Sequence, residues 1–100
     1  MRKEEIVKRI ADKTGIERAE VEVMVNALFA VVKQNLVRGH DVHFRGFGSF
    51  IVKRRAAKKA RNITKNETLI LPERFIPIFR ASEAFIEHVK SNSELIDLNQ

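Results

Sequence analysis

The sequence predicts an α+β domain with two N-terminal helices, a three-stranded antiparallel sheet that carries a long β-ribbon arm, and a C-terminal helix. Three observations predict it. Apolar residues repeat at helical spacing in the first third of the chain and again near residue 85. The segment between them alternates and is rich in β-branched and aromatic residues. Finally, the surplus positive charge is confined to one segment that lies between two predicted strands. One hundred residues suit a single domain.

The first predicted helix covers about residues 3–13, and Gly15 follows it as a stop. A second and longer helix is predicted from about Glu17 to Arg38, with Gly39 after it. Its apolar residues keep helical spacing, and they are Val21, Met24, Val25, Leu28, Phe29, Val32 and Leu36. The stripe spreads further, to Val23, Ala27 and Val31, which predicts that one face meets the sheet and another a partner subunit.

Two strands are predicted at residues 41–45 and 49–52, joined by a turn at Gly46-Phe47-Gly48 whose glycines can adopt φ values closed to other residues. A third strand is predicted from Phe75 to Phe79. Pro77 within it indicates an edge strand or a bulge, because proline cannot donate a ladder hydrogen bond.

Ser82 has the position of an N-cap, with Glu83 in the favourable first turn of a last helix that continues through Val89. The tail 91–100 holds further apolar residues behind a possible cap at Ser93. Two alternatives are open for this tail, namely a docked extra turn and a frayed end.

The segment from Lys53 to Arg74 holds eight of the nineteen basic residues and two of the thirteen acidic ones, so the rest of the chain is neutral. Strand-like runs on both sides favour a long hairpin over the alternative of a solvated, disordered loop. Strands of roughly ten residues would reach about 30 Å from the body. The predicted single domain therefore has a body at 1–52 and 75–90, an arm at 53–74 and an extension at 91–100.

A neutral body with one strongly basic arm is typical of proteins that bind a polyanion, and the arm is long enough to follow a DNA groove. Phosphate neutralisation is expected from the arm residues Lys53, Arg54, Arg55, Lys58, Lys59, Arg61, Lys65 and Arg74. Lys3 and Arg80 would extend the path if the DNA wraps onto the body. Affinity should therefore fall steeply as salt is added.

Several other classes of function are not supported. The chain has no cysteine, and His40, His43 and His88 lack the spacing of a metal site. No nucleophile and base constellation and no glycine-rich phosphate loop is visible, so we expect neither catalytic residues nor a cofactor. No apolar run is long enough to span a membrane, and the charged start is unlike a signal peptide. Most of the phenylalanines are expected in the core and the dimer interface, in preference to stacking on nucleobases.

The motif Gly46-Phe47-Gly48-Ser49-Phe50, the pair Arg61-Asn62 at the arm tip, and Pro72 and Pro77 with Phe79 make residues 1–90 resemble the bacterial HU/IHF-type histone-like DNA-binding proteins. The resemblance implies an intertwined dimer whose two arms embrace DNA through the minor groove. It also implies that an apolar residue at each arm tip wedges between base pairs and bends the duplex.

At the wedge position this chain has Ile63 in place of the family's usual proline, which keeps an apolar wedge but loses a rigid φ. Asn66 replaces a common glycine at the tip and is expected to keep the turn. Ala81-Ser82 replaces Pro-Gly before the last helix, and Glu17 replaces a hydroxyl cap. These last two changes concern stability more than DNA.

The implied function is architectural. The protein is expected to bend, wrap or compact double-stranded DNA with little sequence preference, and to favour bent, nicked or flexible sites. It would do so in the cytoplasmic nucleoid, as a homodimer or with a paralogue. Asn62 and Thr64 complete the set of expected DNA contacts at the tip. The alternatives are an IHF-like, site-preferring bending factor, and a protein-assembly or RNA-binding module that uses the basic arm.

Overall fold

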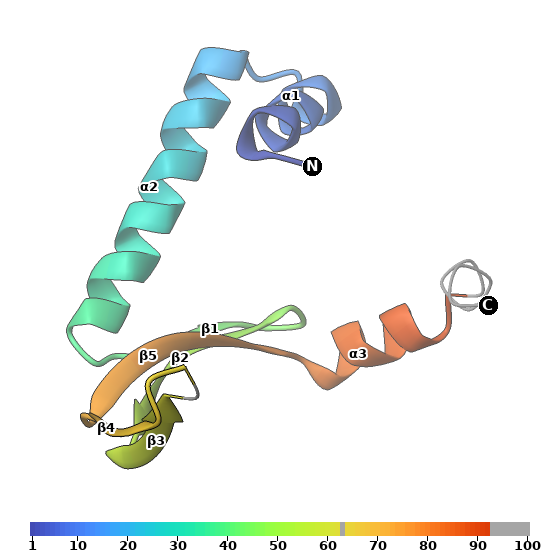
Figure 1. Ribbon diagram of the computed structural model, residues 1–100. Coiled ribbons are helices and arrows are strands. Elements are labelled where there is room, and N and C mark those ends of the chain that lie inside the picture. Colours follow the sequence, from blue (N-terminus) through green and yellow to red (C-terminus); the bar gives the residue numbers. More distant parts are fainter. Residues whose placement is uncertain (63, 93–100) are drawn as a thin grey trace.

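The computed structural model describes residues 1–62 and 64–92, and it begins with the two predicted helices, α1 (Lys3–Thr14) and α2 (Arg18–Val37). Gly15 ends α1 with a φ of 76°, as the sequence predicts. Glu17 at the N-cap of α2 makes no side-chain capping hydrogen bond. α1 packs on the N-terminal end of α2, and the sheet lies at the other end of that helix (Figure 1). Val7 and Val21 are buried where the two helices meet.

The body sheet contains β1 (Val42–Phe44), β2 (Gly48–Arg55) and β5 (Arg74–Ala81), all antiparallel and in the order β1-β2-β5. β5 is therefore an edge strand, as Pro77 predicts. The helix α3 (Glu83–Lys90) follows. The α+β class and the order of the elements are confirmed.

The arm is a separate two-stranded sheet of β3 (Lys58–Asn62) and β4 (Glu67–Leu71). The ribbon arm is present, but its paired strands of 5 residues each are shorter than the roughly ten residues expected. The ladder is interrupted at Ala56 and Ala57 on one strand and at Pro72 and Glu73 on the other. Pro72 accounts for the break, because it has no N–H to donate and restricts the backbone of the residue before it.

The two faces of the body sheet differ in chemistry. Phe44, Phe50 and Phe79 share the face that α2 covers in part, as shown by the strand register and by the groove between helix and sheet. Side chains alternate along a strand, so the remaining residues point to the opposite face, where Ile51, Ile76 and Ile78 lie between polar and basic residues at the two ends. We call this second face the outer face, and it holds His43, Ser49, Lys53, Arg55, Arg74 and Arg80 among its members.

Ser82 caps α3, since its hydroxyl accepts a hydrogen bond from the backbone N–H of Phe85 at 3.1 Å. This confirms the predicted N-cap. The backbone N–H of Ser82 donates to the Phe47 carbonyl, and the Phe85 ring stacks on Phe47 with centroids 5.4 Å apart. These contacts join α3 to the end of the sheet opposite the arm (Figure 1). The predicted cap at Ser93 lies outside the described residues.

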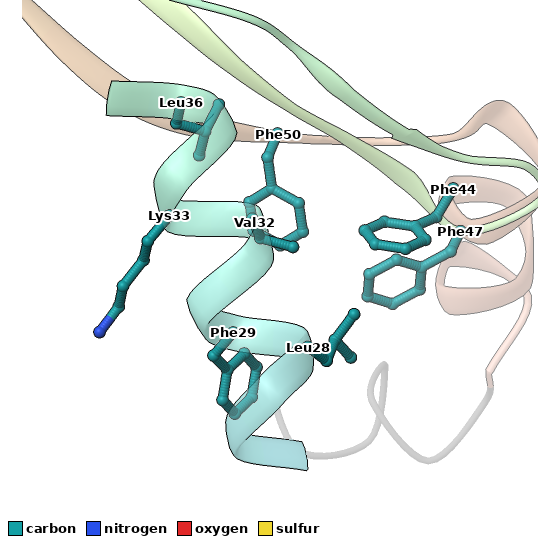
Figure 2. A pocket seen from close by; sticks show the side chains of 8 residues that line it. All are labelled: Leu28, Phe29, Val32, Lys33, Leu36, Phe44, Phe47 and Phe50. Carbon is teal, nitrogen blue, oxygen red and sulfur yellow. The ribbon is translucent and has the colours of Figure 1, made fainter. Parts of the chain in front are cut away.

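A single chain leaves much of its apolar surface uncovered. Between α2 and the sheet lies an open apolar groove of about 600 Å³, and Figure 2 shows Leu28 and Val32 of α2 directed toward Phe44 and Phe47 across it. We call it the α2 groove. Phe29 at its mouth is 47% exposed. The radius of gyration is 19.3 Å, against about 13 Å for a compact domain of 100 residues.

Candidate nucleic-acid interface

Three basic side chains cluster on the outer face where the arm leaves the body. Arg55 of β2 lies directly opposite Arg74 of β5, and Lys53 lies two residues away on the same face. Like charges directly across a ladder destabilise the sheet. An anion placed over this pair would remove the repulsion, so the arrangement is suited to a phosphate group.

Arg54 lies on the other face of the same ribbon, opposite Phe75. Its guanidinium donates to a carboxylate oxygen of Glu73 at 3.0 Å, and both side chains are largely exposed. This ion pair links the end of β2 to the short segment between β4 and β5, where the ladder is interrupted. The structure thus separates Arg54 from Lys53 and Arg55, with which the sequence groups it.

The arm itself presents cations on both faces. Lys59 and Arg61 share one face, opposite Ile70 and Thr68. Lys58 lies on the other face, opposite Leu71. All three basic residues are exposed. When a duplex contacts one face of the arm, the cations on the other face of the arm would lie beside the duplex and not directly against it.

At the arm tip, Asn66 adopts a positive φ of 54°, which confirms that it keeps the turn expected of a tip glycine. The side-chain oxygen of Asn66 accepts a hydrogen bond from the Arg61 guanidinium, which holds that guanidinium at the tip. Thr64 and Lys65 are exposed turn residues. Asn62 ends β3 opposite Glu67. Ile63, the predicted wedge, lies outside the described residues.

The two body residues assigned from the sequence lie in different surroundings. Arg80 is on the outer face of β5, opposite Ser49, and the pair Ile51 and Ile78 separates it from Lys53 and Arg55 on that face. Lys3 belongs to α1, where its ammonium group donates to the Asn26 side chain at 3.0 Å. The structure therefore places Arg80 on the same face of the sheet as the arm-base cations, and Lys3 on the helical part of the body.

Sequence reasoning missed this division of the cations between two faces. The alternation of side chains along a strand could have assigned each cation to a face, since odd-numbered residues of β1 and β2 fall on the outer face. Odd numbering also adds His43 and Ser49 to that face.

Among residues 1–62 and 64–92 there is no group of His, Asp and Glu side chains able to hold a metal ion. In the same residues, no helix is long and apolar enough to cross a membrane.

Comparison with known proteins agrees with this geometry. A family model described as "Bacterial DNA-binding protein" matches residues 1–90. The DNA-binding protein HRL18 of Rhizobium leguminosarum is 37% identical over 91 residues, which cover 91% of this chain and 100% of the relative. The DNA-binding protein HU of Thermotoga maritima is 33% identical over 90 residues, covering 90% of this chain and 100% of that protein.

Among solved structures, an Anabaena HU–DNA cocrystal structure matches with a TM-score of 0.86 and 29% identity, covering 92% of this chain and 100% of the other. The V42I mutant of Thermotoga maritima HU matches with a TM-score of 0.68 and 25% identity, covering 89% and 99%.

Proposed function

The chain belongs to the family of bacterial DNA-binding proteins that includes HU, and we propose that it bends and condenses double-stranded DNA as an architectural protein and not as an enzyme. The observation that carries this proposal is the basic arm. It extends from a fold that matches an HU protein solved on DNA, and it holds the entire surplus charge of the chain. Unstacking a base step costs a few kcal/mol, which the additional arm contacts to a bent duplex offset.

We propose that the working unit is a dimer in which a second copy fills the α2 groove. The groove is lined by large apolar side chains, and Met24, Leu28 and Phe29 of α2 are each about half exposed in the single chain. An apolar surface of this size marks an interaction site. A single chain with so few buried residues also has little core with which to fold alone. The partner is an identical copy or a paralogue.

The proposed DNA contacts follow the outer face onto the arm. Lys53, Arg55 and Arg74 would bind phosphates at the arm base, and Arg80 would continue the path on the body. Further along the arm the proposed contacts are Lys58, Lys59, Arg61, Asn62, Thr64 and Lys65. Arg54 is proposed to reach DNA only after it releases Glu73, because the two are paired in the free protein. Lys3 would join only if the duplex wraps as far as α1.

Ile63 is proposed as the wedge at the arm tip. Its support comes from the sequence, which places one aliphatic residue among polar ones at the point where the family usually has proline. Contacts in the minor groove distinguish mainly A·T from G·C pairs. The tip therefore carries little sequence information, which favours broad binding over an IHF-like preference for particular sites. A location in the nucleoid of the cytoplasm follows from this activity.

The proposal is tested by a fluorescence-anisotropy titration against one short duplex, intact or nicked at its centre, at several salt concentrations. A bending clamp binds the nicked duplex more tightly, and its affinity falls steeply as salt rises. Equal affinity for the two duplexes would contradict bending and leave a protein that coats DNA by charge. Binding to neither would favour a protein-assembly or RNA-binding role for the arm.

A further inference from the structure

A second apolar pocket lies on the α2 side of the body sheet, next to the α2 groove and toward the arm. It has a volume of about 500 Å³, and its lining includes Leu36 and Val37 from the end of α2, Val52 of β2, and Phe75 and Pro77 of β5. We call it the arm-base pocket. Val37 is 87% exposed and Phe75 is 64% exposed, so a single chain leaves this apolar surface uncovered.

The arm-base pocket adjoins the α2 groove, because Lys33 and Leu36 line both. A second copy that fills the α2 groove, as proposed above, therefore reaches the edge of the arm-base pocket. The C-terminal helix of each copy is uncovered as well, since α3 has no buried residue and Val89 near its end is 46% exposed. The C-terminal part of the chain thus also presents apolar surface to another copy.

The extension that follows α3 has a composition that suits this pocket. Residues 93–100 lie outside the described residues, and their sequence holds Leu95, Ile96 and Leu98 together with Glu94 and Asp97. The extension 91–100 has no basic residue. Aliphatic side chains with carboxylates beside them match an apolar pocket that has cations at its rim.

Two cations border the arm-base pocket. Lys33 lines it, and Arg38 directly follows Val37. Both are exposed, and among the described residues neither forms an ion pair with a carboxylate. Figure 2 shows the Lys33 side chain directed away from the aromatic side chains of the α2 groove. The charge of the rim is therefore complementary to that of the extension.

We propose that residues 94–98 of one copy occupy the arm-base pocket of the other copy in the dimer. Their three aliphatic side chains pack on Val37 and Phe75, and their two carboxylates approach Lys33 and Arg38. The inference rests on the proposed dimer and adds to it a C-terminal segment that binds the partner. Removal of these aliphatic side chains from water stabilises the dimer.

The reach of the chain assigns the extension to the partner's pocket and not to its own. The arm-base pocket is at the arm end of β5, whereas α3 follows the opposite end of that strand and continues away from the arm (Figure 1). At about 3.3 Å per strand residue and about 1.5 Å per helix residue, Lys90 lies roughly 30 Å from the pocket of its own chain. Even fully extended, the stretch from Ser91 to Ile96 spans at most about 22 Å. The segment therefore meets the pocket of another copy.

Disulfide trapping tests this contact, since the chain has no cysteine of its own. One full-length variant carries Val37→Cys, and a second carries Leu95→Cys, Ile96→Cys or Leu98→Cys in turn. The two proteins are mixed, left to exchange subunits and oxidised, and mass spectrometry identifies the products. A mixed disulfide requires the two Cα atoms to approach within about 7 Å.

Ile70→Cys replaces Val37→Cys in the matched control, because Ile70 is also highly exposed but lies on the arm. At least one position of the extension should form the mixed disulfide with Val37→Cys in about tenfold higher yield than with Ile70→Cys. A double variant with Val37→Cys and Ile96→Cys in one chain, diluted into excess unaltered protein, should form no disulfide within that chain. Closure within one chain would overturn the assignment to the partner.

A second measurement follows the stability of the dimer. Leu95→Ser combined with Ile96→Ser should lower the melting temperature by about 5 °C at a fixed protein concentration. The inference is overturned if this temperature is unchanged, or if Val37→Cys gives no more mixed disulfide than Ile70→Cys. Sedimentation velocity of the unaltered protein separates the two failures. A monomer contradicts the proposed dimer, whereas a dimer without the mixed disulfide contradicts this inference alone.

Discussion

Gly48 is the residue at which the sheet leaves no room for a side chain. A Cβ atom at this position would lie 2.5 Å from the Arg80 carbonyl oxygen and 2.6 Å from Cζ of the Phe79 ring. The neighbouring Gly46 is required for a different reason, because its φ is 81° while nothing lies within 4 Å of its missing Cβ. The predicted glycine turn therefore combines one conformational requirement with one steric requirement.

We expect Gly48→Ala to lower the free energy of unfolding by about 2 kcal/mol, because backbone and ring atoms must both move to admit the methyl group. Thermal unfolding followed by circular dichroism measures the change. Gly46→Asn is the matched control, since asparagine tolerates positive φ and meets no neighbour, and it should cost clearly less. Equal losses for the two variants would show that close approach at Gly48 is unimportant.

Ile63→Ala is predicted to reduce bending, and with it the preference for a nicked duplex, more than it reduces affinity for intact DNA. A smaller side chain fills less of an opened base step but leaves the phosphate contacts unchanged. Energy transfer between dyes at the two duplex ends reports the bend. Ile70→Ala is the control, because Ile70 is an exposed apolar residue on the strand of the same arm. Uniform loss of affinity on all substrates would exclude a wedge.

Among the elements, the joint between body and arm shows most clearly how a local interaction can act on a whole segment. The ladder is broken on both strands there, and Arg54 of β2 forms an ion pair with Glu73, which lies in the break. An exposed pair of this kind contributes only about 0–1 kcal/mol to stability. Its position nevertheless lets it bias the orientation of the arm, and it keeps one cation neutralised before DNA binds.

Glu73→Gln is expected to raise affinity for duplex DNA about two- to threefold at low salt and to steepen the salt dependence. The reason is that Arg54 then reaches a phosphate without first releasing a carboxylate. Anisotropy titrations across a salt series give both quantities.

A double-mutant cycle assigns the effect to this pair. The gain from Glu73→Gln should disappear when Arg54 is already alanine, because the two changes act on one interaction. A gain that persists in the Arg54→Ala background would mean that Glu73 acts by general repulsion of DNA and not through its partner.

Most of the helices, strands and turns could be predicted from the residues at their ends. Gly15, Gly39, Ser82 and Asn66 each perform the role expected of the residue type at that position. The break in the arm could not be predicted, because Ala56 and Ala57 carry no turn signal and Pro72 is also compatible with an edge strand. The sequence also does not reveal which residues pair across the strands. It therefore could not place Arg54 on the face opposite Arg55, or predict that His43 lies next to Ser49.

At the scale of the whole molecule, the described chain extends over 57 × 41 × 28 Å with few buried residues, so its folding free energy should depend on association. We predict that thermal stability rises with protein concentration, as expected when the folded state is an oligomer. Leu28→Asp should abolish the dimer by placing a charge in the α2 groove.

Sedimentation velocity measures the oligomeric state of both forms. Ile70→Asp provides the control, since it makes the same chemical change on an exposed arm position, and it should remain dimeric. A Leu28→Asp protein that sediments as a dimer would show that copies associate through another surface.

The place of Pro77 has a consequence for copies that crowd together along one duplex. The backbone N–H of Val52 points away from β5, toward Asp41, so its partner Pro77 faces outward at the free edge of the sheet. Any residue other than proline at position 77 would present an unpaired backbone N–H, to which a strand of another molecule could pair. Pro77 has no N–H to present there, and the ladder between β2 and β5 loses no hydrogen bond because that N–H would point away from β2. Pro77 thus removes one backbone donor from the middle of this edge, which disfavours edge-to-edge pairing of neighbouring molecules.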